Sequence, residues 1–302
     1  MPVFNFKKEV KLYVVRNGLK YILDIYPDVS ASQTFNETSV PVKTLHSQFN
    51  MFEDAVITSA NPANFTFTIP LLYENDMDIV LELLRDYDTG NVEASMKTAD
   101  IYLENASEVY KLELAVVESG TFDITRNSII LLNISGTAKK LTKHVGAIPG
   151  ALQARSSTRT FAAATSVEVI IGGVTQINVT TISVELKNDI EWVNPQILQN
   201  SLNVTDASST MYYEAFVVQS RTLSGMVQTY ITDENNVNVN TWKTTSSLSI
   251  KAGNLGSGYL LEFVLPSVVY TNRLDTQEIY TQSYDFRMNS NPADLTTVIK
   301  LN

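Results

Sequence analysis

The sequence predicts a mainly β protein made of two tandem β-sandwich or barrel domains, the first of which carries a flanking α-helix. Three observations lead to this fold class. β-Branched and aromatic residues alternate with polar residues along much of the chain, which is typical of strands with one buried face. A glycine turn lies near the start of each half. Tyr-x-Leu-Glu followed by an apolar run occurs at Tyr110 and again at Tyr259.

The two halves of the chain align with each other in two registers. The match from Tyr110 to Tyr259 gives a shift of 149 residues, and the match of Asn17-Gly18 with Gly172-Gly173 gives a shift of 155. The second register also pairs Val29 with Val184. Regular β alternation alone can produce part of this similarity. Two registers that agree within six residues nevertheless indicate a duplication with a small deletion.

The first half begins with a hairpin signal. Asn17-Gly18 separates the apolar runs KLYVV and LKYILDI, and this dipeptide favours a type I′ turn between antiparallel strands. The segment NFTFTIPLL (residues 64–72) then alternates large apolar side chains with threonine. We therefore expect a strand there with one buried and one solvated face.

One helix is predicted, at residues 75–87. Asn75 can cap its start, and Gly90 lies just beyond its end. Apolar residues recur there at i, i+3, i+4 and i+7, namely Met77, Val80, Leu81 and Leu84. The corresponding segment of the second half, NNVNVNTWKT, is shorter and less periodic. A helix is therefore expected against the first domain alone.

These signals divide the chain into a first β-domain at residues 1–138, a linker or mobile arm at 139–166 and a second β-domain at 167–302. The middle segment is rich in Gly, Ala, Ser and Thr and has little periodicity. Long polar loops are also expected at residues 30–62 and 188–211.

The charge of the chain is uneven. The net charge is −10, yet the stretch from Ile124 to Val167 contains no Asp or Glu and six Lys or Arg residues. An acidic surface repels phosphate backbones, so adhesion to nucleic acid is not expected. A basic segment on an acidic protein is expected to bind the acidic surface of a second copy of the same protein. The candidate contacts between subunits are Lys139, Lys140, Lys143, Arg155 and Arg159.

The sequence offers little chemistry, and we predict no enzyme, cofactor, metal site or catalytic residue. The chain has no cysteine, and its two histidines, His46 and His144, have no evident metal-binding partners. Glu104 and Glu113 could form a pair of hydrolytic carboxylates, although such residues are more often the solvated face of a strand. The glycine-rich GNLGSG at 253–258 lacks the Lys-Ser/Thr of a phosphate loop.

No targeting signal is expected. The amino-terminal sequence lacks the apolar core of a signal peptide, and no stretch approaches 18 apolar residues. We therefore expect a protein made in, and acting from, a cytoplasm.

The order of these segments resembles that of phage tail tube proteins. In the first half, VSASQTFNETSV, then NFTFTIPLL and then NDMDIVLELL follow the order of strand, long loop, aromatic strand and amphipathic helix. In the second half, VTTISVELKNDIEWVNPQIL is followed by EAFVVQSRTLSGMVQTYITDE, which is similar to the loop and strand of the same fold. The short second helix departs from that pattern.

The resemblance implies a structural subunit of the virion, assembled in the host cytoplasm. Tube domains form sixfold rings that stack, and two domains in one chain would let three chains form a pseudo-sixfold ring, with a hexamer as the other possibility. DNA would pass through an acidic lumen during ejection without specific binding. Baseplate, tape measure and sheath proteins are the implied partners.

Three alternatives remain open from the sequence. The chain could be a baseplate-proximal tube initiator or hub rather than the repeating tube subunit. It could be a receptor-binding or carbohydrate-binding β-sandwich that uses Trp192 and tyrosines as stacking platforms. It could also be a hydrolase that uses Glu104 and Glu113.

Overall fold

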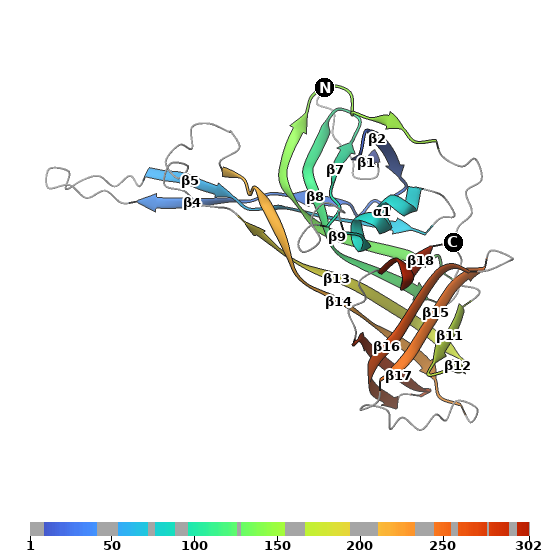
Figure 1. The fold of residues 1–302 in the computed structure, drawn as a ribbon. Coiled ribbons are helices and arrows are strands. Elements are labelled where there is room, and N and C mark those ends of the chain that lie inside the picture. Colours follow the sequence, from blue (N-terminus) through green and yellow to red (C-terminus); the bar gives the residue numbers. More distant parts are fainter. Residues whose placement is uncertain are drawn as a thin grey trace.

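The computed structural model describes most of the 302 residues. The described ranges are 9–40, 54–71, 76–87, 96–125, 128–154, 167–193, 211–232, 245–254, 259–276, 278–289 and 295–301. The described residues form a mainly β fold with one α-helix, as predicted. The strands of the first half lie above those of the second half, and a long hairpin projects to one side (Figure 1).

The first half contains ten strands and the helix α1 (Asp76–Arg85) in its described residues. The strands are β1 (Lys11–Arg16), β2 (Leu19–Leu23), β3 (Ser30–Ser32), β4 (Phe35–Val40), β5 (Asp54–Ala60), β6 (Ala63–Pro70), β7 (Ala99–Glu104), β8 (Val109–Thr125), β9 (Leu131–His144) and β10 (Ala151–Leu152).

The second half contains eight strands and one 3₁₀ helix in its described residues. The strands are β11 (Val167–Ile171), β12 (Val174–Gln176), β13 (Val179–Val193), β14 (Ala215–Tyr230), β15 (Ser246–Asn254), β16 (Tyr259–Thr276), β17 (Tyr280–Met288) and β18 (Ile299–Leu301), and the 3₁₀ helix is η3 (Leu295–Thr297).

Both halves pair their strands in the same order. The first half follows β2-β1-β7-β8-β9-β6-β3. The second half follows β12-β11-β15-β16-β17-β14-β13. Each strand of one series thus has a counterpart in the other, and the two halves share one topology. The glycine turns that first suggested a repeat connect β1 to β2 and β11 to β12.

The predicted turns and strands are confirmed where the structure describes them. Asn17 and Gly18 both have positive φ, 51° and 75°, as a type I′ hairpin requires. On β6 the side chains of Phe65, Phe67 and Ile69 are buried, so the predicted alternation defines the core face of that strand. The predicted helix is α1, whose Val80, Leu81 and Leu84 are buried. The weaker segment NNVNVNTWKT lies outside the described residues.

Two of the predicted loops contain strands. Residues 35–40 and 54–60, expected within a loop at 30–62, form the separate antiparallel hairpin β4–β5 that projects from the body (Figure 1). In the second half β13 continues through Val193, beyond the expected loop start at residue 188. The sequences FNETSV and DAVITSA lack the regular alternation of apolar and polar residues by which a strand is recognised.

The predicted arm at 139–166 also begins within regular structure. Residues 139–144 are the end of β9, where Glu113 pairs with Lys140 and Val109 pairs with His144 across β8. Lys139 and Lys140 break the alternation of apolar and polar residues in the sequence. The strand β9 nevertheless continues through them, because its pairing with β8 continues. Residues 155–166 lie outside the described residues. The boundary between two domains stays a prediction.

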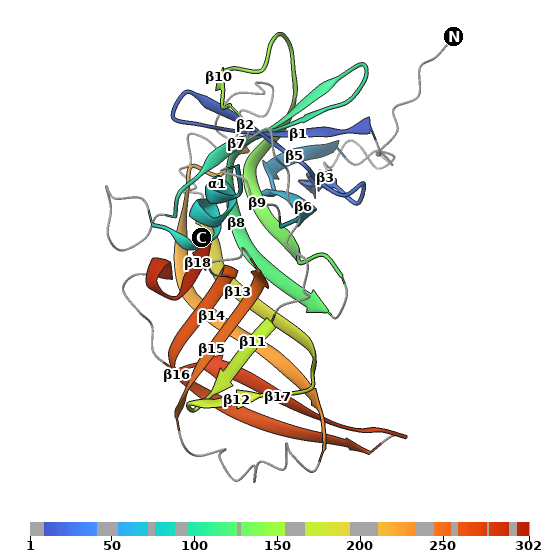
Figure 2. The same ribbon diagram turned by 90° about the vertical axis from the view of Figure 1, so that its right-hand side faces the viewer.

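The two halves share a single sheet and a single core. The last part of β8 pairs with β13 from Ser119↔Lys187 to Thr125↔Thr181, which joins the first half to the second edge to edge. Figure 2 shows β8 and β13 between the upper and lower groups of strands. On the core side of this junction, Phe122 contacts Phe263 of β16 edge to face, with ring centroids 5.1 Å apart. None of the helices described is long and apolar enough to cross a membrane.

Candidate assembly surfaces

The β8–β13 junction has one apolar and one polar face. Ile124 lies opposite Ile182, and Phe122 lies opposite Val184, and all four side chains are buried in the core. Because neighbouring residues of a strand point to opposite faces, Asp123 and Ser183 lie on the other side of the sheet. There Ser183 Oγ donates a hydrogen bond to Asp123 Oδ1 at 3.2 Å. The junction thus combines core packing with a polar outer surface.

This polar face continues across the first half. Asn133 of β9 donates to Asp123 Oδ2 at 2.6 Å, and Thr68 of β6 donates to Asp28 Oδ2 at 2.5 Å. The Thr68 hydroxyl also lies 2.8 Å from Asn133 Oδ1. Hydroxyl, amide and carboxylate groups are therefore linked from the segment before β3 to the junction.

The same face continues across the second half as a row of directly opposed residues. The pairings of β8, β13, β14, β17 and β16 place Asp123, Ser183, Met226, Asp285 and Thr271 in one line across five strands. This row contains two carboxylates and no base. The next row contains Glu185 and Arg287, so charges of both signs lie nearby. We call this surface, defined by the row from Asp123 to Thr271, the polar face.

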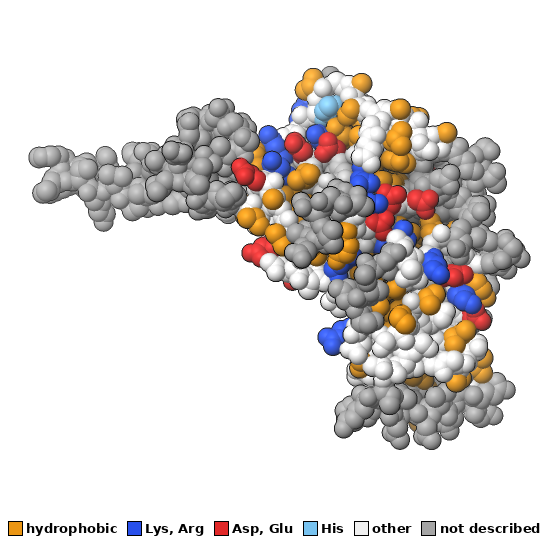
Figure 3. Space-filling view, viewed as in Figure 1, with side chains coloured by type: hydrophobic (Ala, Val, Ile, Leu, Met, Phe, Trp, Pro, Cys, Tyr) orange, Lys and Arg blue, Asp and Glu red, His pale blue; other side chains and the backbone are white. Residues whose placement is uncertain are grey.

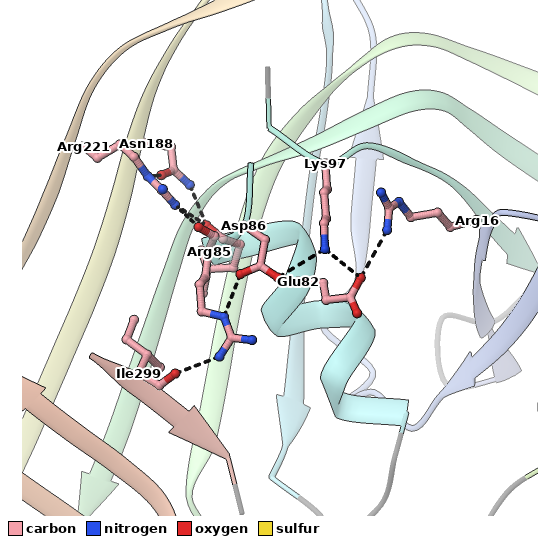
Figure 4. Close-up of polar contacts among 9 residues, drawn as sticks. Arg16, Glu82, Arg85, Asp86, Lys97, Asn188, Arg221 and Ile299 are labelled. Atoms are coloured by element: carbon pink, nitrogen blue, oxygen red, sulfur yellow. Dashed lines mark hydrogen bonds and ion pairs between the residues drawn. The ribbon is translucent and has the colours of Figure 1, made fainter. Parts of the chain in front are cut away.

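The helix α1 covers the opposite side of the sheet. A Cβ atom on Gly120 of β8 would lie 2.4 Å from Leu84 Cδ2, which shows how closely the helix approaches that strand. The last turn of α1 is tied to the second half by polar contacts (Figure 4). Asn188 of β13, only 1% exposed, donates to the main-chain oxygens of Leu84 and Val117, each at 3.0 Å.

Arg221 of β14 completes these contacts. Its guanidinium donates to Asn188 Oδ1 at 2.7 Å and to the main-chain oxygen of Arg85 at 2.7 Å. The guanidinium carbon also lies 4.6 Å from the centroid of the Tyr87 ring. Burial lowers the pKa of the Arg221 guanidinium, while its hydrogen bond with Tyr87 opposes that change. We call Asn188 and Arg221 with the α1 carbonyls the helix clamp.

Acidic and basic side chains surround α1 on the face shown in Figure 3, where blue and red are interspersed. Arg16 and Lys97 both bind Glu82, at 3.1 and 3.3 Å, and Lys97 also binds Asp86 at 3.2 Å. Arg85 donates to the main-chain oxygen of Ile299 at 2.7 Å, which links the helix to β18 (Figure 4). These contacts fix the helix between the two halves.

Two of the five basic residues predicted at subunit contacts have partners within the chain. Lys143 forms an ion pair with Glu108 at 2.5 Å, and Lys140 lies 4.6 Å from the centroid of the Tyr212 ring. Lys139 is half-buried on β9. Arg155 and Arg159 lie outside the described residues. A role for any of the five in subunit contacts stays a prediction.

The carboxylates considered for hydrolysis are separated along the sheet. Glu104 lies opposite Val109, whereas Glu113 lies four residues further along β8, about 13 Å at the usual rise of a strand. Glycosidase carboxylates lie about 5–9.5 Å apart. Glu104 accepts a hydrogen bond from the Tyr13 hydroxyl at 2.6 Å, and Glu113 lies 3.9 Å from the Lys111 ammonium group. Each of the two carboxylates thus contacts another side chain of the sheet, and the two do not face each other as a hydrolytic pair.

The remaining candidates for ligand binding pack within the chain. Trp192 is half-buried, contacts Phe216 with ring centroids 5.4 Å apart, and donates from Nε1 to Thr137 Oγ1 at 2.8 Å. His144 meets the edge of Tyr102 with centroids 5.1 Å apart, and His46 lies outside the described residues. In the described ranges no three His, Asp or Glu side chains gather as a metal site.

A comparison with known protein families decides the class of protein. Residues 3–300 match the Bacteriophage Baseplate Tube Protein Family. The chain belongs to this family. Membership in the baseplate tube family confirms the predicted relationship to phage tail tube proteins. A search of curated proteins found no match.

Family membership makes the chain a structural component of the phage virion, in the baseplate and tube region of the tail. A baseplate tube protein associates with other components of the tail. Sequence reasoning did not identify the polar face or the helix clamp, since both depend on which strands become neighbours. The only signal for Arg221 was its place in the R-x-x-S-G strand of the second half.

Proposed function

We propose that this protein forms rings of the tail tube near the baseplate and that DNA passes through these rings during ejection. The observation that carries the proposal is the edge-to-edge junction of β8 and β13 between two halves of the same topology. Such a junction lets successive halves extend one sheet. A ring of three chains would then present six similar halves, which corresponds to a pseudo-sixfold ring.

The polar face supports a conducting role. The row from Asp123 to Thr271 contains two carboxylates and no base, the adjoining row carries Glu185 and Arg287, and the whole chain has a net charge of −10. A surface of this kind on the inside of a ring would repel DNA phosphates and limit adhesion. We therefore assign the polar face to the lumen and the face covered by α1 to the outside of the ring.

The remaining details belong to the same proposal. The first domain would span residues 1–138 and the second 167–302, with the segment between them at contacts between subunits or rings. The ring would assemble in the host cytoplasm and stack with itself or with tape measure, sheath and baseplate proteins. The protein would conduct DNA through the ring and would catalyse no reaction.

Electron microscopy of the purified protein, combined with mass determination by light scattering, tests this function. We expect rings or short tubes with a central channel, whose mass is a multiple of three chains. Hexameric rings would keep the tube function but overturn the pseudo-sixfold arrangement. A protein that remains a monomer both alone and with neighbouring tail proteins would overturn the proposal.

A further inference from the structure

Three ionisable side chains meet where β7 pairs with β8. The ammonium nitrogen of Lys111 lies 2.9 Å from Asp100 Oδ2 and 3.9 Å from Glu113 Oε2. Tyr102 lies directly opposite Lys111, and its ring centroid is 6.0 Å from the same nitrogen. Two neighbouring strands thus hold one amine and two carboxyl groups beside an aromatic ring. We call Lys111, Asp100 and Glu113 the lysine triad.

An irregularity in the strand pairing positions the lysine triad. The pairing of β7 with β8 shifts register between Ala99 and Ile101. Asp100 therefore lies opposite two residues of β8, Glu113 and Leu114. An extra residue of this kind is a β-bulge, which redirects side chains and is frequent next to active sites. Here the bulge brings the second carboxylate to the same place as the first.

Leu114 gives an independent indication that the Asp100 carboxyl group is deliberately held. Its main-chain φ is 51°, in the left-handed region that a branched apolar residue seldom adopts. In this conformation the main-chain N–H of Leu114 donates a hydrogen bond to Asp100 Oδ1 at 3.1 Å. One carboxyl oxygen is thus fixed on an N–H donor while the other faces the amine of Lys111. Strained backbone of this kind gathers at reactive sites.

The lysine triad is partly shielded from water. The side chains of Lys111 and Asp100 are 22% and 33% exposed, and Tyr102 is buried. Burial lowers the pKa of the Lys111 amine, but the hydrogen bond and charge of Asp100 and the charge of Glu113 outweigh it, so that this pKa is raised. The resting state is therefore an ion pair, and the amine must lose a proton before it can act as a nucleophile.

We propose that Lys111 Nζ and Asp100 Cγ join in an amide bond, which cross-links β7 to β8 within each chain. Glu113 accepts a proton from the Lys111 ammonium group, directly or through one water molecule, and the neutral amine attacks Cγ. The Nζ–Cγ bond forms while the Leu114 N–H stabilises the charge that develops on Oδ1. The Cγ–Oδ2 bond then breaks, and Oδ2 leaves as water with two protons that came from the ammonium group.

The physical setting favours this condensation. Groups held in contact by a folded chain react as if their concentration were about 10⁵–10⁸ M, which opposes the reverse reaction with water. The chain has no cysteine, so a disulfide cannot connect these strands. Each molecule reacts once with itself, so the step is a modification and not the turnover of a substrate. The bond would replace a partly exposed ion pair, which stabilises a fold little, by a covalent link.

Mass spectrometry of the denatured full chain tests the proposal. We expect a mass lower than that of the sequence by one water molecule. Trypsin should also fail to cut after Lys111, because its amine is blocked, and should release a fragment from Thr98 to Arg126 that lacks one water. The full mass of the sequence, together with cleavage at Lys111 in protein kept folded for days, would overturn the proposal. This measurement uses the unaltered chain, so it does not depend on the folding of a variant.

Variants assign the bond to its two residues. Lys111→Arg and Asp100→Ala should each restore the full mass. The control is Lys143→Arg, since Lys143 also pairs with a carboxylate, Glu108 at 2.5 Å, but is 58% exposed. This control should keep the loss of one water. A loss of water that survives Lys111→Arg would overturn the proposed bond.

Glu113→Gln tests the proton transfer. The amide side chain has a similar shape but cannot accept the proton, and general acid–base groups contribute about a hundredfold or more to rate. We expect the cross-linked fraction of freshly purified Glu113→Gln to rise about a hundred times more slowly than that of the parent. An equal rate in both proteins would overturn the role of Glu113 and leave the bond itself to be judged by the mass of the parent.

Discussion

Arg221 donates a hydrogen bond from Nη2 to the main-chain oxygen of Arg85 at 2.7 Å, so a strand of the second half holds the end of a helix of the first. The last carbonyl groups of any helix lack partners within it. Here the helix clamp supplies them from a part of the chain more than a hundred residues away in sequence. The position of α1 is thus coupled to the arrangement of the two halves.

Replacing Arg221 should destabilise the protein strongly. In Arg221→Met the carbonyl of Arg85 and the side-chain oxygen of Asn188 lose the donor that Arg221 provides, and the carbonyl of Leu84 keeps only Asn188, which should cost about 1–3 kcal/mol of unfolding free energy. Urea unfolding monitored by circular dichroism measures the loss. Arg287→Met, which changes an exposed arginine on β17, is the control and should change stability by less than about 0.5 kcal/mol. Equal effects of the two changes would contradict the clamp.

The two members of the clamp should act together. Asn188 and Arg221 are hydrogen-bonded to each other and share the carbonyl of Leu84. A double-mutant cycle with Asn188→Leu and Arg221→Met should therefore give a coupling energy of about 0.5–3 kcal/mol. Additive losses would show that each side chain binds the helix independently.

Close packing of α1 on β8 gives a third expectation. Gly120→Ala would place a Cβ 2.4 Å from Leu84 Cδ2, and overpacking of this kind usually costs about 1–3 kcal/mol. Thermal and urea unfolding measure the change. Thr121→Ala alters the next residue on the opposite face of β8 and should have the smaller effect. Unchanged stability of Gly120→Ala would mean that the Leu84 side chain, or α1 itself, is free to move away from the sheet.

The carboxyl group of Glu108 should titrate below its ordinary range. Hydrogen bonds from Lys143 and Tyr110 lower the pKa of Glu108 from its ordinary value of 4.5. Since the folded pKa is depressed, the stabilising contact is present above the unfolded pKa and is lost as pH falls through the folded pKa. Carboxyl chemical shifts followed by NMR give the value directly.

Variants of Lys143 and Lys139 distinguish the effect of this contact on the pKa of Glu108 from the effect of the overall charge of β9. Lys143→Ala should raise the pKa of Glu108 towards its ordinary value. Lys139→Ala should leave it unchanged, because no contact joins Lys139 to this carboxylate. A Glu108 pKa that responds equally to both changes would indicate only long-range charge effects.

Much of the fold followed from patterns within short segments. Positive φ at Asn17 and Gly18 and buried alternation on β6 both arise from local backbone preferences and from one buried face. Those signals survive in the sequence because each depends on neighbouring residues alone. The helix α1 was predictable for the same reason, since its apolar residues recur at one helical period.

The candidate surfaces depended on contacts that no local pattern records. The polar face arises because Asp123 and Ser183, far apart in sequence, become direct neighbours at the β8–β13 junction. The hairpin β4–β5 was expected as a loop because its polar residues do not alternate with apolar ones. Lys140 and Lys143 were expected in a free arm because their partners, Tyr212 and Glu108, are set by the pairing of β8 with β9.

The junction of β8 with β13 also changes how assembly depends on concentration. It forms within one molecule as the chain folds, so dilution does not dissolve it. In a ring of six halves, only every second contact would require an encounter between separate molecules. Half of the contacts that close the ring would therefore exist before separate molecules meet. The two halves joined by each of these contacts would always be present in a one-to-one ratio.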